Sequence, residues 1–264
     1  MRTGRQLFQE HEGRESPAFT WLGQHSFILS LAGHVILIDP FLADMPERLV
    51  SPLFGPADAQ GAVTLTVCTH DHIDHLDPVA VSGLTVETGT HFVVPRACRA
   101  RMLDLGVPEE RLTLLDDGES ARFGELEVTA VKSAHESFDV TPEGHHPWLG
   151  FVLRGEGRSV YHAGDTVWWE GLQARLRSCG PLDLALLPIN GRDGERYRQG
   201  VLGNMTYQEA ADLAGGLDLA LLVPTHYGMF ESNTVDPGLF ASYMDAKYPL
   251  RRYLLPVLSE ITGF

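Results

Sequence analysis

The stretch THDHIDH, residues 69–75, places three histidines and two aspartates in seven positions. It follows VTLTVCT, an apolar and β-branched run that predicts a buried strand. Loops at the carboxyl ends of strands are where α/β proteins commonly place ligand-binding residues. Side chains two apart in an extended segment share a side, so His70 and His72 can bind one ion, whereas Asp74 and His75 lie at the turn into a helix. The spacing favours two adjacent metal positions over one.

A cluster this short cannot enclose an ion alone, so we expect further ligands at the ends of other predicted strands. His135 follows LEVTAVKSA, Asp165 follows SVYHAG, and His226 follows LALLVPT. Each one alone is more commonly an ordinary loop residue, but together with the cluster they complete a seven-ligand, two-ion site. Imidazole and carboxylate ligands without thiolate suit Zn, Mn or Fe and do not select one of them. His145 and His146, in PEGHHPW, are rivals to His135, which we prefer because a strand presents it.

Composition limits the partners of such a site. The 264 residues are 44% hydrophobic and 21% charged, and we expect one domain over residues 1–264. The net charge of −15 argues against a nucleic-acid partner and indicates a small-molecule substrate. The N-terminus has no apolar targeting region and no run of 18 apolar residues occurs, so we expect a cytoplasmic protein with no membrane partner. The three cysteines have no C-x-x-C spacing, which indicates neither a disulfide framework nor a thiolate zinc site.

The order of predicted elements indicates the fold class. FTWLG, SFILSL and HVILID read as a strand meander that opens a sheet. GLQARLRSC, LDLALLPI, TYQEAADLAGGL and LDLALLVPTH then alternate helix, strand, helix, strand. This mixture predicts an α/β (α+β) protein with two sheets packed face to face and helices on the outer faces, a four-layer αββα sandwich.

With these motifs in place, the sequence resembles the metallo-β-lactamase superfamily, through THDHIDH, His135, HAGDT and PTHYG. The resemblance implies the αββα sandwich and two divalent ions, Zn, Mn or Fe. It assigns His70, His72 and His135 to one metal, Asp74, His75 and His226 to the other, and Asp165 to both as a bridge. It also implies that Asp39, in VILIDP, supports the metal-binding loop from behind, with His162 as a looser candidate for the same role.

Longer stretches resemble the L-ascorbate-6-phosphate lactonase-like group within that superfamily. They are WLGQHSFIL, THDHIDHLD, SVYHAGDTVW, LLVPTHYGMF and the segment from LDLALLPINGRDG to MTYQEAADL. This resemblance implies a lactone substrate, such as a sugar-phosphate lactone, and self-association into a homo-oligomer. The chain is shorter than the lactonase proper, and its loop from Gly191 to Gly203 has a different composition.

Substrate contacts are predicted mainly in the loop NGRDGERYRQG. Arg192, Arg196 and Arg198 lie there in an otherwise acidic chain, and the guanidinium fork suits phosphate or carboxylate. Equally, these arginines can be solvated loop charges offset by neighbouring carboxylates. Asn190 and Tyr227, each beside a strand end, are candidate hydrogen-bond donors to a sugar or an oxyanion, although each is somewhat more commonly an ordinary loop residue.

The predicted function is hydrolysis of a small anionic substrate, with a sugar-phosphate lactone as the leading class. Two divalent ions make hydroxide available near neutral pH and polarise the scissile group. Asp74, beside the attacking hydroxide, is the predicted general base. The alternatives are a phosphodiesterase, because the same ion pair serves phosphoryl transfer, and a metal-stabilised binding protein without turnover.

Overall fold

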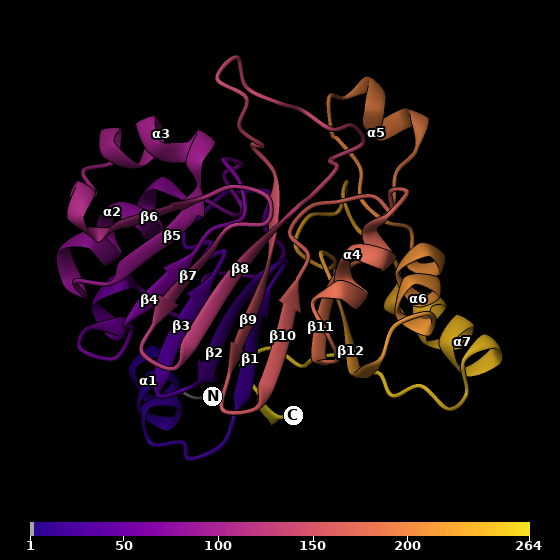
Figure 1. The fold of residues 1–264 in the computed structure, drawn as a ribbon, viewed down its shortest axis with the longest axis horizontal. Coiled ribbons are helices and arrows are strands. Elements are labelled where there is room, and N and C mark those ends of the chain that lie inside the picture. The colour runs from indigo at the N-terminus through magenta and orange to yellow at the C-terminus, as the bar shows by residue number, and fades with distance from the viewer. Residues whose placement is uncertain (1–2) are drawn as a thin grey trace.

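Two sheets form the centre of the computed structural model, which describes residues 3–264 (Figure 1). In spatial order the first sheet contains β13 (Ile261–Gly263), β1 (Ala18–Gly23), β2 (Ser26–Leu31), β3 (His34–Ile38), β4 (Leu65–Val67), β5 (His91–Pro95) and β6 (Leu112–Leu115). The second contains β12 (Leu219–Thr225), β11 (Leu182–Pro188), β10 (Arg158–His162), β9 (Leu149–Gly155), β8 (Leu126–Lys132) and β7 (Ser120–Phe123).

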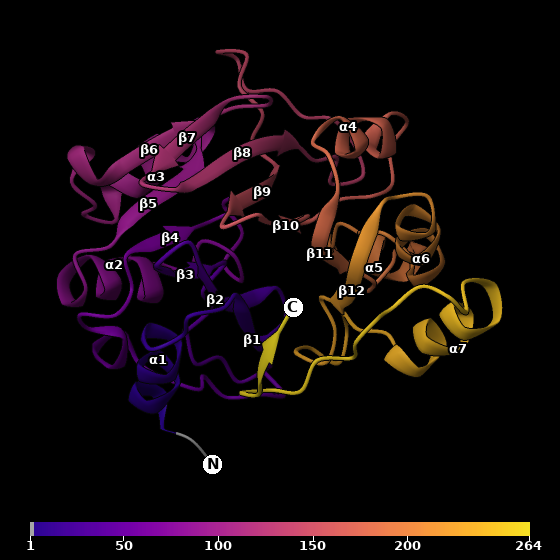
Figure 2. The ribbon, with the colours of Figure 1, turned by 60° about the horizontal axis from the view of Figure 1, so that its bottom comes forward.

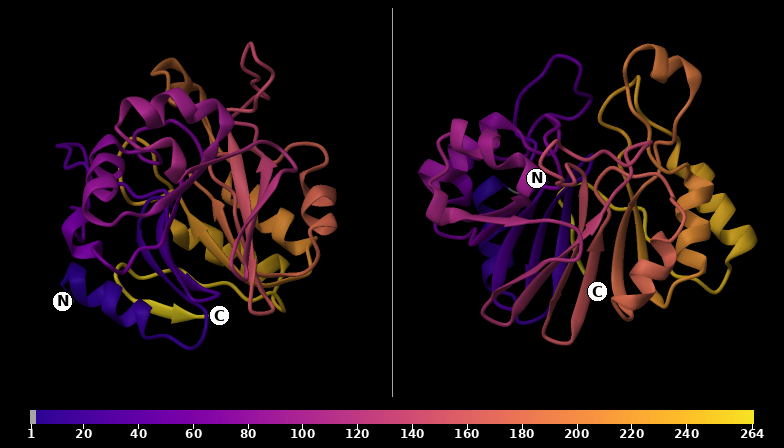
Figure 3. Two further views of the ribbon diagram at one scale, coloured as in Figure 1. Left: turned by 60° about the vertical axis from the view of Figure 1, so that its left-hand side comes forward. Right: turned by 45° about the horizontal axis from the view of Figure 1, so that its top comes forward.

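Helices cover the outer face of each sheet, as Figures 2 and 3 show. The first sheet is covered by α1 (Gly4–Glu12), α2 (Pro78–Glu87) and α3 (Arg99–Asp104). The second is covered by α4 (Leu172–Ser178), α6 (Tyr207–Gly215) and α7 (Pro237–Lys247), while the short α5 (Gly194–Arg198) lies in a loop beyond the strand ends. Three short 3-10 helices complete the described elements: η1 (Pro56–Ala59), η2 (Arg96–Cys98) and η3 (Glu109–Arg111). The predicted αββα sandwich is confirmed.

The first sheet is buried on both faces, because the side chains that alternate between its two faces belong to two apolar cores. In β2, Phe27 and Leu29 point between the sheets, whereas Ile28 points under the helices. In β3, Ile36 belongs to the inter-sheet core and Leu37 to the core beneath α1 and α2. Because successive residues of a strand face opposite sides, near-continuous apolar strands of this kind require a covering layer on each face.

Strand direction brings the predicted ligands to one edge of the molecule. β8 and β10 both run antiparallel to β9, so they run in the same direction as each other. β10, β11 and β12 pair in parallel, so the carboxyl ends of β8, β10, β11 and β12 share an edge. The segments after β8, β10 and β12 carry His135, Asp165 and His226.

Some local structure differs from the sequence prediction. The strand expected over VTLTVCT is limited to β4, because the backbone N–H of Thr69 donates to Oδ1 of Asp39 (2.8 Å) and turns the chain out of the sheet. α1, α7 and β13 were not predicted. None of the helices within residues 3–264 has the length and apolar character that a bilayer crossing demands.

Candidate metal centre

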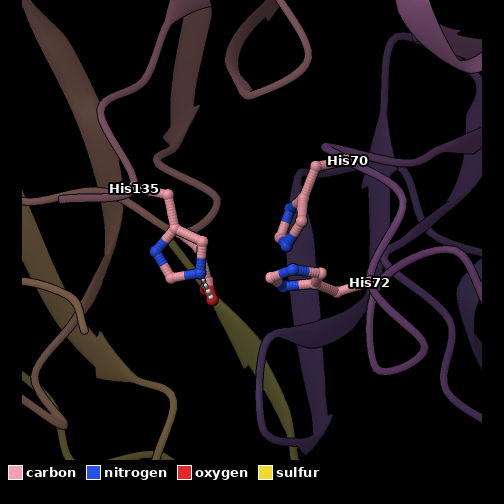
Figure 4. A group of neighbouring side chains, drawn as sticks. His70, His72 and His135 are labelled. Carbon is pink, nitrogen blue, oxygen red and sulfur yellow. Dashed lines mark ion pairs between the residues drawn. The ribbon is translucent and has the colours of Figure 1, made fainter. Parts of the chain in front are cut away.

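The two sheets contribute ligands to a first group of metal-binding side chains. His70 and His72 come from the segment after β4, and His135 and Asp165 come from the ends of β8 and β10. One ligand atom of each of these four residues lies within 4.8 Å of the others. Figure 4 shows His135 approaching from the side opposite His70 and His72. The cluster therefore sits between the sheets at their shared edge.

A second group lies beside the first. It consists of Asp74, His75 and His226, whose ligand atoms also lie within 4.8 Å of one another. Oδ2 of Asp74 is 3.6 Å from Nε2 of His75 and 3.7 Å from Nε2 of His226. The structure thus brings all seven predicted ligands together, from separate places in the chain.

Asp165 faces both groups. Its Oδ2 is 3.5 Å from Nε2 of His135, in the first group. Its Oδ1 is 3.4 Å from Nε2 of His75 and 3.2 Å from Nε2 of His226, in the second. A carboxylate with one oxygen toward each group has the geometry of a bridging ligand.

The side chains fit divalent ions by two tests. Nε2 of His70 and Nε2 of His75 are buried and have no hydrogen-bond partner in the described chain, which is costly unless another group satisfies them. The contacts of 3.2–3.7 Å around Asp165 and Asp74 match the roughly 3.4 Å that separates ligands of a tetrahedral ion with bonds of about 2.1 Å. The donor set suits Zn, Mn or Fe.

Burial and charge prepare the ligands for a cation. Burial lowers the pKa of His70 well below its ordinary value and keeps the imidazole neutral. Burial raises the pKa of Asp165, but His226 and His75 lower it more, so its pKa lies well below the ordinary range. Burial likewise lowers the pKa of His75, yet the surrounding carboxylates outweigh it and raise that pKa to about 10. A metal at Nε2 of His75 needs an unprotonated ligand atom, so metal and proton would compete there.

Asp39 supports the metal-binding loop from behind, at the position that the resemblance implies. Its buried Oδ2 accepts hydrogen bonds from Nδ1 of His75 (2.8 Å), Nε2 of His162 (2.9 Å) and Oγ1 of Thr69 (2.8 Å). Burial opposes ionisation, but the two imidazoles keep the pKa of Asp39 well below its ordinary range. Because Nδ1 of His75 is occupied in this way, its Nε2 is directed at the site.

Two residues of the turn between β1 and β2 reach the site, although neither was among the predicted site residues. Nε2 of Gln24 donates to Oδ2 of Asp74 (2.9 Å), and the backbone carbonyl of Gln24 accepts from the N–H of His226 (3.0 Å). His25 is fully buried and its Nε2 donates to the carbonyl oxygen of Gly164 (2.9 Å), next to Asp165. Their only sequence signal is their polarity within an otherwise apolar hairpin.

The rival histidines of PEGHHPW lie outside both metal-binding groups. Nδ1 of His145 and Nδ1 of His146 contact the carboxylate of Asp116 at 3.1 and 2.7 Å. The neighbouring Trp148 instead packs against the first group, with ring centroids 5.0–5.2 Å from those of its three histidines.

The predicted substrate-binding arginines are held by acceptors of the chain itself. Arg192 donates to both carboxylate oxygens of Glu209 (2.7 and 2.8 Å), and Arg198 is paired with Glu195. Arg196 donates to Oδ2 of Asp193 (2.7 Å). None of the three is among the residues that line the cavity at the metal-binding groups. Substrate contact by these arginines stays a prediction.

The side chains of Asn190 and Tyr227 also contact other residues of the protein and do not line the cavity. Asn190 is buried, and its amide lies between those of Asn204 and Asn233. Tyr227 packs on Trp21, with ring centroids 5.1 Å apart, and burial raises its pKa to about 12. Neither lines the cavity at the metal-binding groups, and their substrate contact also stays a prediction.

A cavity of about 300 Å³ opens onto the ligands. Five of the seven predicted ligands line it: His72, Asp74, His135, Asp165 and His226. The rest of its wall comes from Ile73 and from two loops: Gly200, Val201 and Leu202 at the end of the loop that was predicted to contact the substrate, and Phe230, Ser232 and Asn233 in the loop after β12, which was not predicted to do so. The volume is that of a small-molecule site.

Two facing sheets with a histidine and aspartate centre at their shared edge define an αββα protein with a candidate site for two metal ions. Residues 34–227 match the family described as a beta-lactamase superfamily domain. The chain belongs to this superfamily, and the predicted metallo-β-lactamase membership is confirmed.

Relatives and solved structures agree with this assignment. A UPF0173 metal-dependent hydrolase from Methanopyrus kandleri is 32% identical over 231 residues, which cover 84% of this chain and 88% of the relative. An uncharacterized protein of Mycobacterium tuberculosis is 30% identical over 224 residues, which cover 81% of this chain but only 59% of that protein. The structure of Igni18, a metallo hydrolase from Ignicoccus hospitalis, has a TM-score of 0.74 at 23% identity and covers 94% of this chain and 98% of its own; this likeness shows the fold.

Proposed function

We propose that this protein hydrolyses a small anionic lactone or ester, such as a sugar-phosphate lactone, with Asp74 as general base. One observation carries the proposal: the Asp165 carboxylate faces both metal-binding groups at the wall of a cavity that Asp74 also lines. The resemblance to the lactonase-like group supports the choice of a lactone.

The chemistry divides between the ions and the protein. Two divalent ions, when bound, supply an activated water and a Lewis acid for the scissile carbonyl. Asp74 is placed to take the proton of that water and to pass it to the leaving alkoxide. Gln24 orients this carboxylate, because its Nε2 donates to Oδ2 of Asp74 (2.9 Å).

The volume of the cavity supports a small substrate, and its lining indicates which group would attract the negative charge of that substrate. A volume of about 300 Å³ admits a compact molecule. Within residues 3–264, no lysine or arginine is among the residues that line it. The two carboxylates among the seven ligands balance only half the charge of two divalent ions, so the centre itself attracts an anionic group.

Assays with lactones and phosphodiesters test the proposal on the Zn- and Mn-loaded protein. We expect lactone opening without diester cleavage, and about a 100-fold or greater loss of kcat in Asp74→Asn, the scale of general acid–base catalysis. Asp71→Asn is the matched control, because Asp71 lies in the same heptapeptide but is half exposed and pairs with Arg101 (3.4 Å). Diester cleavage without lactone opening, or full activity in Asp74→Asn, would contradict the proposal.

A further inference from the structure

Asn233 lines the cavity from the loop that follows β12. Its Oδ1 accepts two hydrogen bonds from the protein, one from Nδ2 of Asn190 (2.8 Å) and one from Nη1 of Arg196 (3.1 Å). The side chain is partly exposed, and it shares the cavity wall with Asp74 and Asp165.

Arg196 fixes which atom of the Asn233 amide faces which way. A guanidinium has donors only, so the amide atom beside Nη1 must be the oxygen. Arg196 is itself held in place, because Nη1 also donates to the carbonyl oxygen of Asn190 (2.7 Å) and Nε donates to Oδ2 of Asp193 (2.7 Å). Only 15% of the Arg196 side chain is exposed, whereas 49% of its partner Asp193 is.

The Nδ2 group of Asn233 is therefore a donor without a partner within residues 3–264, on a residue that lines the cavity. Oδ1 is turned to Arg196 and Asn190, and no hydrogen bond from Nδ2 to another residue occurs within residues 3–264. A donor on a side chain that a partly buried network holds, left without a partner in the wall of the cavity that Asp74 and Asp165 also line, is a preorganised site for an oxygen that gains negative charge.

We propose that Nδ2 of Asn233 donates a hydrogen bond to the substrate oxygen that gains charge during hydrolysis, and that Arg196 is the positioning residue that holds this donor. The inference rests on the proposed function, because the oxygen belongs to the molecule hydrolysed at this centre. Val201, Leu202 and Phe230 line the same cavity, so the group carrying that oxygen has an apolar flank. The substrate class is a compact molecule with an oxyanion-forming head and an apolar side.

Inorganic phosphate, titrated calorimetrically into the Zn-loaded protein, probes this donor without turnover. Asn233→Ala removes the donor, and we expect phosphate to bind about tenfold or more weakly, the scale of a hydrogen bond to a charged group. Asn233→Asp keeps an acceptor for Asn190 and Arg196 but has no donor for the cavity, so phosphate affinity should fall at least as far while the melting temperature holds. Glu231→Gln, exposed and outside the cavity wall, is the matched control and should bind phosphate as the wild type does.

A double-mutant cycle tests the part assigned to Arg196. Arg196→Lys cannot bridge Asn190, Asn233 and Asp193 as the guanidinium does, so it should weaken phosphate binding by itself. On the Asn233→Ala background the same change should add little, because the donor that it positions is already absent. Additive losses would overturn the positioning role, since a purely structural arginine would act independently of Asn233.

The outcomes separate this inference from the proposed function. Phosphate affinity unchanged in Asn233→Ala overturns the inference, whether or not the wild type opens lactones. Wild-type protein that binds no phosphate overturns it as well, because no oxyanion then reaches the amide. Weakened binding in both Asn233 variants, with zinc content equal to that of the wild type, supports the inference even if the proposed substrate class fails.

Discussion

Single residues set the orientation of the metal ligands, and Asp39 shows how. Its backbone has a φ of +44°, a conformation that is uncommon for residues other than glycine. This strained position turns the carboxylate toward Thr69, His75 and His162 at once. The strain is stored where it aligns a ligand of the metal centre.

Replacement of Asp39 by asparagine should weaken metal binding although Asp39 touches no ion. An amide offers one acceptor oxygen in place of two and no negative charge, so Nδ1 of His75 and Nε2 of His162 lose part of their support. We expect zinc affinity, measured by competition with a chelator, to fall by about 10–100-fold. The exposed Asp44→Asn should bind zinc like the wild type, and an Asp39→Asn protein with wild-type affinity would contradict the assigned role.

The individual site residues also differ in how well the sequence could predict them. His135, Asp165 and His226 were identified because each ends an apolar strand, and strand ends of one direction share an edge. Gln24 and His25 lie in a two-residue turn, where polar side chains are ordinary, so their contacts depend on how the sheets meet. Asn233 was missed for the same reason, since its position is fixed by partners more than thirty residues away in sequence.

At the scale of elements, strands were more predictable than the loops that complete the cavity. Alternating and continuous apolar runs identified most strands, because burial on both faces leaves a strong pattern. The loop of Arg192, Arg196 and Arg198 carried no such pattern. Arg192 pairs with Glu209 of α6, which it meets because the loop folds back on that helix, whereas Arg196 and Arg198 pair with carboxylates of the loop itself. Local charge alone could not distinguish substrate contact from an internal ion pair.

The glycine that follows β10, Gly164, leads to a prediction about how tightly the end of this strand is packed. Gly164 has a φ of +58°, and a Cβ there would lie 2.8 Å from the carbonyl oxygen of Leu149 and 2.9 Å from Cβ of Thr69. Gly157, in the turn before β10, has a φ of +73° with no atom within 4 Å of such a Cβ. In urea unfolding we expect Gly157→Ala to cost about 1 kcal/mol, from its backbone conformation alone. Gly164→Ala should cost about 1–3 kcal/mol more, from crowding between the sheets.

Comparison of Gly157→Ala with Gly164→Ala separates the cost of crowding from the cost of the backbone conformation. Both substitutions add one methyl group at positive φ, so the difference between their losses measures the crowding of Gly164 against Leu149 and Thr69. Equal losses would mean that the strand end and Thr69 move apart freely. In that case Asp165, the next residue, would not be held against the metal-binding groups by packing.

For the whole molecule, the metal centre connects the two halves of the sandwich. His70, His72, Asp74 and His75 follow a strand of the first sheet, whereas His135, Asp165 and His226 follow strands of the second. Two apolar cores already hold the layers, one that includes the inter-sheet contacts and one beneath α1, α2 and α3. Ions bound at this edge would therefore add stability to a fold that the two cores maintain.

Removal of the ions should lower the melting temperature and leave the fold intact at 25 °C. One ion at a free concentration a thousandfold above its dissociation constant stabilises the native state by about 4 kcal/mol, so the loss of even one ion corresponds to about 10 °C for a domain of this size. Thermal unfolding followed by far-UV circular dichroism, before and after chelation, measures the shift, and zinc added back should reverse it. An unchanged melting temperature after complete removal of the metal, shown by metal analysis, would contradict this prediction. In that case the seven side chains do not hold the two sheets together through bound ions, because a ligand that binds only the native state must stabilise it.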